Sequence, residues 1–338
     1  MSNPTKLRWG ILGAARVNER LLPAIVEAPN SELIAIASRR PGAATETLQK
    51  YAPKVQGVTC YDNLEALLKD DRIQAIYLPL SNHEHGEWAV RAIESGKHVL
   101  IEKPMALTVA DIDAIEAAAK KHKVVVMEGF MYRFHPQFDR AQEIIRSGII
   151  GDIKHVRASY SFIMRQARMY RVANKVELGG GAMWDIGPYA MHSLRMCFGS
   201  EPLSVTAMAK YNESGADIST SGILDFGDGK RGHFDISFEC SRRSEYEVTG
   251  SKGGFKCHTV WQLPPSDVPV LSWWTEDGRY WEEKLPASNH FNLEIEHFSD
   301  CVLSGKTPLL NLADARGNCR AIVATMQSAA EGRTIKLG

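Results

Sequence analysis

The first 127 residues alternate short apolar segments with segments of helical periodicity, and this alternation constrains the fold more than any other feature. Six of the apolar segments are expected strands, at 7–12, 33–37, 58–61, 75–78, 99–101 and 124–127. Helices are expected between them, at 16–28, 64–69, 84–95 and after Thr108. Short, nearly all-apolar strands separated by helices are typical of a parallel sheet covered on both faces. Residues 1–127 are therefore predicted to form a doubly wound α/β domain of the Rossmann type.

The pattern changes near residue 150, where expected strands follow one another directly. They lie at 153–163, 203–211, 221–226, 231–239 and 244–249. Residues 233–239 alternate polar and apolar side chains, and Gly227-Asp228-Gly229 is typical of a hairpin turn. Helices are expected at 136–147, 188–197, 290–304 and 312–331. Residues 128–338 are therefore predicted to form an α+β domain on a mostly antiparallel, open-faced sheet.

Composition excludes several classes of protein. Forty Lys and Arg balance 40 Asp and Glu, which argues against a nucleic-acid-binding protein that acts through bulk positive charge. No apolar run approaches the roughly 20 residues that cross a bilayer, and the N-terminal residues lack the apolar segment of a signal peptide. The six cysteines form no C-x-x-C pair, so reduced, buried thiols in a cytoplasmic protein are expected.

A glycine-containing turn follows the first expected strand. Measured against the motif G-x-G-x-x-G/A, the chain keeps Gly13 but has Ala15 and Asn18 at the next two positions. Such a turn lets the backbone approach a pyrophosphate at a helix N-terminus. The cofactor-binding residues expected here are Gly13, Ala14, Ala15 and Arg16. A strand-to-helix turn without a ligand is the alternative.

The residues after the second expected strand indicate which dinucleotide binds. An NAD site usually has Asp or Glu there, to accept a hydrogen bond from the ribose 2′-hydroxyl. This chain instead has Ser38, Arg39 and Arg40. Guanidinium groups suit a 2′-phosphate because they bind its oxygens in a bidentate manner. NADP is therefore favoured over NAD, and an exposed basic loop without a ligand is the alternative.

Four further motifs carry a family resemblance. They are Glu102-Lys103-Pro104, residues 77–85 (YLPLSNHEH), residues 128–136 (EGFMYRFHP) and residues 179–189 (GGGAMWDIGPY). Together, and in the order in which they stand along the chain, they resemble the Gfo/Idh/MocA oxidoreductases, the relatives of glucose-fructose oxidoreductase, NADP-dependent xylose dehydrogenase and dimeric dihydrodiol dehydrogenase. The resemblance covers essentially the whole chain.

The resemblance implies three catalytic residues. Lys103 is the motif lysine that contacts the nicotinamide ribose and the substrate hydroxyl, Asp185 orients the substrate, and Tyr189 transfers the hydroxyl proton. Residues i and i+4 share one face of a helix, so Asp185 and Tyr189 are expected to point into one pocket. A tyrosine of pKa about 10 needs a nearby cation to act as a base near pH 7, which Lys103 would supply. A core tyrosine is the alternative for Tyr189.

Other residues take roles from their positions in the motifs. Those expected to line the cofactor are Leu80, Asn82, His85 and Glu102, and those expected to contact the substrate besides the catalytic residues are Arg168 and Arg171. The run Gly179–Gly181 is expected to let the backbone approach a ligand. His83 and Glu84 depart from the family pattern. No metal is expected, because no cysteine or carboxylate pattern accompanies His83 and His85.

The resemblance implies an NADP-dependent dehydrogenase or reductase acting on a CH–OH group of a sugar or polyol. Oxidation of an aldose at C1 to the lactone is favoured. The alternatives are a sugar ketone or aldehyde reductase, a trans-dihydrodiol dehydrogenase and, in a different class, a non-catalytic NADP-binding regulator. The family also implies a homodimer or homotetramer formed through the C-terminal sheet, and neither nucleic acid nor membrane is an expected partner.

Overall fold

The computed structural model describes residues 6–165, 169–173 and 175–337 and divides the chain into two compact units. The first unit runs up to Met131 and also contains His290–Arg316, and the second contains Tyr132–Asn289 and the chain from Gly317 onward. Residues 290–316 thus differ from the sequence-based division, which grouped them with the C-terminal domain. The physical reason is that α10 (His290–Ser304) packs on α1 (Asn18–Glu27) and beside the first two strands.

The first unit is built on a six-stranded parallel sheet. Its strands are β1 (Leu7–Leu12), β2 (Ser31–Ala37), β3 (Thr59–Tyr61), β4 (Ala75–Leu78), β5 (His98–Glu102) and β6 (Val126–Gly129). The order is β3-β2-β1-β4-β5-β6, and every neighbouring pair is parallel. This doubly wound order confirms the predicted fold and places the reversal of strand order between β1 and β4, at whose carboxyl ends ligands bind in such sheets.

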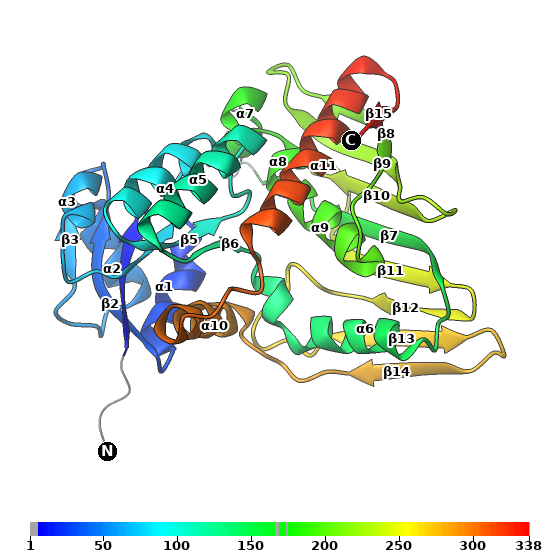
Figure 1. Cartoon of the computed structure of the whole chain (residues 1–338), viewed down its shortest axis with the longest axis horizontal. Helices are drawn as coiled ribbons and strands as arrows, with labels where there is room; N and C mark the ends of the chain where they lie inside the picture. Colours follow the sequence, from blue (N-terminus) through cyan, green and yellow to red (C-terminus); the bar gives the residue numbers. More distant parts are fainter. Residues whose placement is uncertain (1–5, 166–168, 174, 338) are drawn as a thin grey trace. The chain divides into compact units, whose positions relative to one another are not determined.

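Helices connect the strands of this sheet (Figure 1). Besides α1 they are α2 (Ala43–Tyr51), α3 (Leu64–Leu68), η1 (Asn82–Glu84), α4 (His85–Glu94) and α5 (Val109–His122), whereas α10 comes from a later part of the chain. The N-cap expected for α5 is present, because the Thr108 hydroxyl accepts a hydrogen bond from the Asp111 N–H at 3.1 Å. The sequence pattern did not indicate α2, whose exposed face is wide and whose buried residues are small: Ala43, Ala44 and Thr47.

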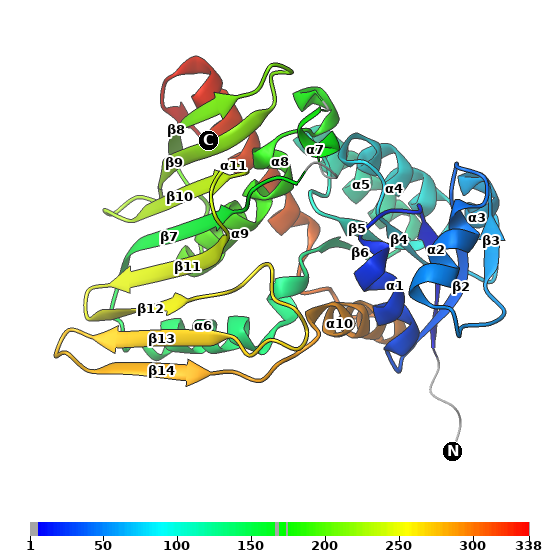
Figure 2. The ribbon, with the colours of Figure 1, turned by 180° about the vertical axis from the view of Figure 1, so that it is seen from behind.

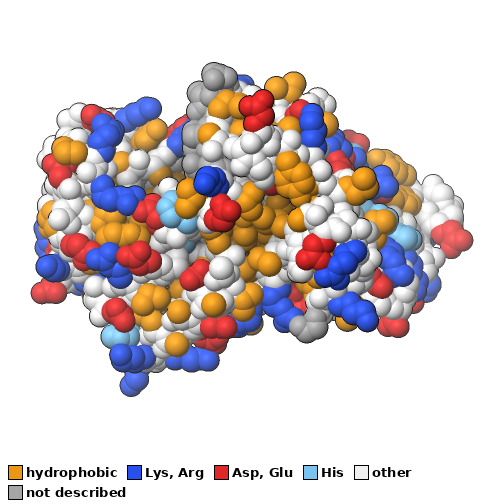
Figure 3. All heavy atoms as spheres, turned by 90° about the horizontal axis from the view of Figure 1, so that it is seen from above, with side chains coloured by type: hydrophobic (Ala, Val, Ile, Leu, Met, Phe, Trp, Pro, Cys, Tyr) orange, Lys and Arg blue, Asp and Glu red, His pale blue; other side chains and the backbone are white. Residues whose placement is uncertain are grey.

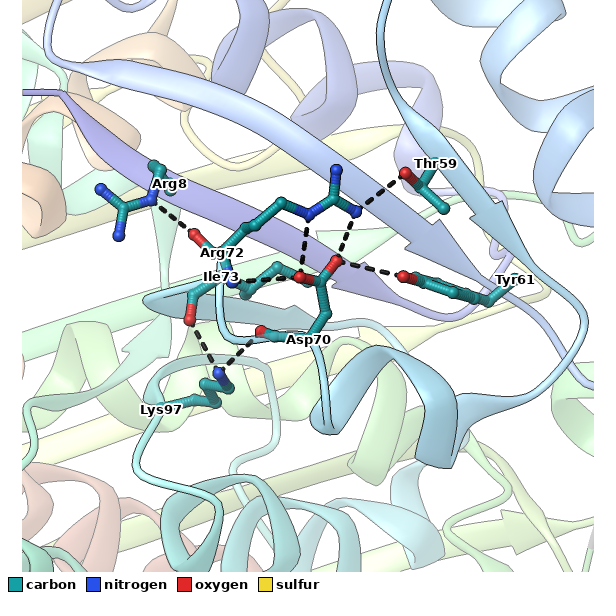
Figure 4. Close-up of polar contacts among 7 residues, drawn as sticks. All are labelled: Arg8, Thr59, Tyr61, Asp70, Arg72, Ile73 and Lys97. Atoms are coloured by element: carbon teal, nitrogen blue, oxygen red, sulfur yellow. Dashed lines mark hydrogen bonds and ion pairs between the residues drawn. The ribbon is translucent and has the colours of Figure 1, made fainter.

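A network of polar side chains joins the amino ends of the strands, whereas the expected site lies at their carboxyl ends (Figure 4). Arg72 binds both oxygens of Asp70, at 3.0 and 2.7 Å, and also donates to the Thr59 hydroxyl. Lys97, just before β5, donates to the carbonyl oxygens of Asp70 and Ile73. These bonds give partners both to the charged side chains and to the loop carbonyl groups. The residues at the amino ends of the strands therefore stabilise the fold.

The second unit is built on a nine-stranded sheet. Its strands are β7 (Ile153–Ser161), β8 (Ser204–Tyr211), β9 (Asp217–Asp225), β10 (Arg231–Ser237), β11 (Arg243–Gly250), β12 (Gly253–Cys257), β13 (Val270–Thr275), β14 (Tyr280–Lys284) and β15 (Ile335–Lys336). The order is β14-β13-β12-β11-β7-β10-β9-β8-β15, antiparallel except where β10 runs parallel to β7. The sheet therefore confirms the mostly antiparallel prediction.

Helices lie on one face of this sheet (Figure 1). The helical segments not yet given are η2 (Met131–Phe134), α6 (Pro136–Ser147), α7 (Tyr170–Ala173), η4 (Val176–Leu178), α8 (Ala182–Asp185), α9 (Gly187–Phe198) and α11 (Leu312–Glu331). Seen from behind, strands β7 to β14 lie in front of the helices (Figure 2). Along β10 the buried residues alternate with half-buried ones, as the pattern of 233–239 predicted. The sheet is therefore open on one face.

The surface carries both signs of charge. On the face drawn in Figure 3, Lys and Arg lie interspersed with Asp and Glu, and neither sign gathers into one large patch. Within the described ranges, no helix has the length and hydropathy of a membrane span. All six cysteines are free, but only four are buried, because Cys60 is half-buried and Cys240 is exposed.

Candidate functional site

The turn after β1 has the geometry of a dinucleotide-binding turn. Gly13 has φ +142°, and a Cβ there would lie 3.0 Å from the Leu80 side chain. The wholly buried Asn18 donates from Nδ2 to the Gly13 carbonyl oxygen at 2.8 Å. Asn18, which departs from the glycine motif, therefore holds the turn closed from the first residue of α1.

Three backbone N–H groups of this turn are available to a ligand. Among the described residues, none accepts a hydrogen bond from the N–H groups of Ala14, Ala15 or Arg16. They precede α1, whose N-terminus favours negative charge. These backbone N–H donors therefore fit a pyrophosphate. All four residues expected at this turn, Gly13 to Arg16, lie between β1 and α1.

The segment after β2 presents a hydroxyl and two guanidinium groups. Ser38 is almost buried, and its Oγ accepts a hydrogen bond from the Arg40 N–H at 3.1 Å. Arg39 and Arg40 are exposed. Arg39 pairs with Glu84 through two contacts, Nη1–Oε1 at 2.5 Å and Nη2–Oε2 at 2.9 Å, and Arg40 pairs with Glu46. The first of these ion pairs joins the loop after β2 to the loop after β4.

The buried side chain of His85 connects the segment after β4 to the segment after β5. Its Nδ1 lies 2.7 Å from the Pro104 carbonyl oxygen and its Nε2 lies 3.0 Å from the Leu80 carbonyl oxygen. Burial lowers the pKa of this imidazole, outweighing the two carbonyls that favour its charged form. His85 was expected to line the cofactor, but it is wholly buried and both ring nitrogens face backbone carbonyls. It therefore positions Leu80 and the loop that carries Lys103.

The loop after β5 is held by buried polar contacts. The Tyr77 hydroxyl donates to Glu102 Oε1 at 2.5 Å, and the Met105 N–H donates to Glu128 Oε1 at 2.7 Å. These bonds flank Lys103, which is half-buried. Tyr77 and Glu128 belong to the recognised motifs, but their role in fixing this loop could not be read from the sequence.

A buried carboxyl lies behind this loop. Glu294 of α10 is 2% exposed, and burial raises its pKa well above the ordinary value, with the charge of Glu102 acting in the same direction. Burial therefore favours the protonated, neutral form of Glu294. Its helix was not expected in this unit, so no sequence pattern indicated that Glu294 interacts with Glu102.

The segment that carries Asp185 and Tyr189 consists of two helices. Asp185 is the last residue of α8, and Tyr189 lies in the first turn of α9, with Ile186 between the helices at φ −116° and ψ −21°. The two residues were expected on one face of one helix. The break precedes Pro188, which lacks a backbone N–H and stands in the first turn of α9, where no N–H is needed for an intrahelical hydrogen bond.

Tyr189 packs within an aromatic cluster, defined as Tyr132, Tyr160, Tyr189 and Trp261. Its ring centroid lies 5.7 Å from that of Tyr160 and 6.2 Å from those of Tyr132 and Trp261. The Tyr132 hydroxyl lies 2.5 Å from His192 Nδ1 of the same helix. Tyr189 is 7% exposed, so its ring is fixed on several sides and its hydroxyl has few alternative positions.

Asp217 fixes the start of α8. Its Oδ2 accepts hydrogen bonds from the Met183 N–H at 2.9 Å and from the Thr220 hydroxyl at 2.7 Å. Gly181 has φ +107°, and a Cβ there would lie 2.1 Å from Asp217 Oδ1. The glycine was expected to make room for a ligand, but it makes room for this carboxylate. Burial raises the pKa of Asp217, although its hydrogen-bond donors favour the charged form.

The remaining expectations concern arginines and metal. Arg168 lies outside the described residues, and Arg171 is in α7 with a side chain that also lies outside them. His83 is in η1, next to the buried His85. Within the described parts of the chain, no group of three or more His, Cys, Asp or Glu side chains is arranged to hold a metal ion.

Comparison with known families gives two matches along the chain. Residues 7–130 match the oxidoreductase family with an NAD-binding Rossmann fold, Gfo/Idh/MocA. Residues 138–256 match the Gfo/Idh/MocA C-terminal domain. The two matches follow the order of the two sheets.

Individual proteins match over nearly the full length. A D-xylose 1-dehydrogenase (NADP(+)) from Haloferax volcanii is 30% identical over 98% of this chain and 100% of its own. A 3-ketoreductase from Actinomadura kijaniata, solved with NADP and TDP-benzene, is 28% identical with a TM-score of 0.88, covering 96% and 98% of the two chains. An aldose-aldose oxidoreductase from Caulobacter crescentus, solved with glycerol, is 27% identical with a TM-score of 0.88, covering 98% and 100%.

Proposed function

Because the chain belongs to the Gfo/Idh/MocA family of oxidoreductases, we propose that it transfers hydride between NADP(H) and a carbinol carbon of a sugar or polyol. The favoured reaction is oxidation of an aldose at C1 to the lactone. The observation that carries this proposal is the likeness, over 98% of the chain, to a xylose dehydrogenase that uses NADP. The likeness to an aldose-aldose oxidoreductase supports the same substrate class.

The residues of the first unit support NADP as the cofactor. In the part of the chain that the structure describes, the backbone N–H groups of the turn after Gly13 have no acceptor, and at the N-terminus of α1 they suit a pyrophosphate. Ser38, Arg39 and Arg40 follow the neighbouring strand β2, where the adenosine ribose lies in folds of this kind. No Asp or Glu stands at these three positions to accept the 2′-hydroxyl of NAD.

The proposed chemistry divides between a cation and a proton acceptor. The nicotinamide, when bound, accepts the hydride. Lys103 holds the substrate hydroxyl and stabilises its oxygen as the proton leaves, and Asp185 orients the sugar through its neighbouring hydroxyls. Tyr189 takes the proton as its phenolate in oxidation, becoming the phenol, and the phenol returns the proton in reduction. Packing within the aromatic cluster holds this hydroxyl in one position, which favours proton transfer because the donor and acceptor need little reorganisation.

Reduction of a sugar ketone is the second candidate. The likeness to the 3-ketoreductase, at a TM-score of 0.88, favours it. The same residues serve this direction, since Tyr189 then donates the proton to the carbonyl oxygen. The substrate rather than the catalytic groups distinguishes the two candidates.

We also propose a homo-oligomer formed through the open face of the nine-stranded sheet. Met208 of β8 is 78% exposed and Ile223 of β9 is 46% exposed, and both point away from the buried positions of their strands. Large exposed apolar side chains on one face are typical of an interaction surface. Light scattering of the wild type and of Met208→Glu is the test, with a smaller assembly expected for the variant.

A substrate panel tests the function. The protein is incubated with NADP and aldoses, polyols or dihydrodiols, or with NADPH and sugar ketones, while the absorbance of reduced nicotinamide is followed. We expect reduction of NADP with at least one aldose. Activity only with ketones and NADPH would favour the second candidate, and silence in both directions after removal of any copurified cofactor would contradict both.

A further inference from the structure

The ion pair between Arg39 and Glu84 occupies the guanidinium that the proposed function assigns to the 2′-phosphate. The Glu84 carboxylate binds both terminal nitrogens of Arg39, which is the bidentate arrangement that a phosphate would use. Arg39 is exposed, with a side chain 59% accessible, whereas the Glu84 side chain is only 13% accessible. The carboxylate is therefore the shielded partner of the pair and the guanidinium the solvent-exposed one.

The topology places this ion pair at the carboxyl ends of the parallel strands, where the cofactor is proposed to bind. Arg39 follows β2 and Glu84 ends η1 after β4, and in the sheet β1 lies between these two strands. The pair consequently bridges the position at which β1 ends and the Gly13 turn begins. Glu84 is held in η1, where its N–H donates to the Ser81 carbonyl oxygen at 2.8 Å. It also begins the helix α4 as its N-cap residue.

The charge of Glu84 persists at neutral pH. Burial acts to raise the pKa of this carboxyl, but the hydrogen bond and the charge of Arg39 hold it below the ordinary value. A phosphomonoester carries between about 1.5 and 2 negative charges near pH 7. When such a group approaches Arg39, it meets a carboxylate that already holds both terminal nitrogens, so the two anions compete for one cation.

We propose that Glu84 is a cofactor-specificity residue that competes with the 2′-phosphate of NADP for Arg39. The proposal rests on the proposed function, and it predicts that this chain binds NADP more weakly, and discriminates less against NAD, than its two arginines alone would allow. NAD has a hydroxyl in place of the phosphate and leaves the ion pair intact. Glu84 therefore reduces the difference between the affinities of the chain for NADP and for NAD.

The variant Glu84→Gln tests this, because it keeps the size of the side chain and removes its charge. Dissociation constants are measured by calorimetry for NADP, NAD and the fragment 2′,5′-ADP. We expect NADP and 2′,5′-ADP to bind about three- to tenfold more tightly than to the wild type, with NAD changed less than twofold. The matched control is Glu87→Gln, since Glu87 lies in the same helix and pairs with Arg91 instead. It should change neither cofactor by more than twofold.

A second variant shows whether the effect passes through Arg39. In an Arg39→Met background, Glu84→Gln should leave the affinity for 2′,5′-ADP unchanged, because the contested cation is gone. Weaker NADP binding by Glu84→Gln would overturn the proposal and make Glu84 a positioning residue for Arg39. An equal gain for NAD and NADP would also overturn it, as a general charge effect. A wild type that binds neither dinucleotide would instead refute the proposed function itself.

Discussion

The carboxylate of Asp217 accepts a hydrogen bond at 2.9 Å from the backbone N–H of Met183, and this bond anchors the start of α8 to strand β9. The adjoining Gly181 has no side chain that would displace the carboxylate. The position of Asp217 therefore requires glycine at residue 181. The short helix that follows ends at Asp185 and leads directly into the first turn of α9, which holds Tyr189. The position of both proposed site residues thus depends on a residue about 30 positions away in the sequence.

Asp217→Ala should therefore impair turnover without weakening cofactor binding. It leaves the Met183 N–H without its acceptor, and a buried unsatisfied donor lowers stability by about 1–3 kcal/mol. We expect kcat to fall at least about tenfold, since misplaced catalytic groups lose rate steeply. The dissociation constant of NADP should stay within twofold. The control is Asp225→Asn on the same strand, and an equal loss of kcat in that variant would contradict the account.

Tyr189→Phe should lower kcat by about 10²- to 10⁴-fold, the usual contribution of general acid–base catalysis. The ring contacts with Tyr160 and Trp261 do not use the hydroxyl, so folding should be preserved. Steady-state kinetics and NADP binding are the measurements. Tyr160→Phe removes a hydroxyl from the same aromatic cluster and should change kcat less than about threefold. Unchanged turnover in Tyr189→Phe would exclude this residue as the proton acceptor.

Asp70→Asn should reduce stability at neutral pH but not in strong acid. Its hydrogen bonds from Arg72 lower the pKa of Asp70 to about 2, against an unfolded value of about 3.9. The stabilisation is present above pH 3.9 and is lost as the pH falls through 2. Because Arg72 is half-exposed, solvent screening leaves about 1–2 kcal/mol. Urea unfolding at pH 7 and pH 2.5 measures this, with Asp71→Asn as control, and a constant difference between the two pH values would contradict it.

Glu294→Gln should raise stability more as the pH rises. Because burial raises the pKa of Glu294, the folded chain holds this proton to a higher pH than the unfolded chain, which loses it above about pH 4.3. The free energy of unfolding of the wild type therefore falls with rising pH. The glutamine variant cannot ionise. Its thermal midpoint should exceed that of the wild type at pH 8 and match it at pH 4. The control is Glu296→Gln, a half-exposed residue of the same helix, and a variant less stable at pH 8 would show that Glu294 is not neutral there.

Periodicity predicted much of the fold because burial on one or both faces is recorded directly in the residue pattern. The bounds of β4 and α6, and the N-cap at Thr108, agree with the structure for this reason. Strands β12, β13, β14 and the two-residue β15 were missed. β12 begins with two glycines, which weaken a strand pattern, and the stacked pair Trp273 and Trp281 becomes meaningful only once β13 and β14 are paired. The sequence pattern predicted a helix at 290–304, but not that this helix packs on α1.

Residues of the candidate site could be predicted where they belong to a recognisable sequence motif. Residues whose role depends only on contacts in the folded chain could not. Gly13, Lys103 and Tyr189 stand in recognisable segments. Asp217 lies at a strand end, where an acid usually means a turn, and nothing in the sequence pairs it with Gly181. Glu84 showed only as a departure from a family pattern. Its bidentate contact with Arg39 joins residues 45 positions apart, which no local pattern could indicate.

The most direct test of the central claim follows the hydride itself. The aldose that is oxidised fastest is supplied with deuterium at C1 together with NADP, and the reduced cofactor is analysed by mass spectrometry and NMR. Hydride transfer from the carbinol carbon predicts one deuterium at C4 of the nicotinamide and a lactone without deuterium at C1. Reduced cofactor that carries no deuterium, or lactone formed without reduction of NADP, would contradict the account.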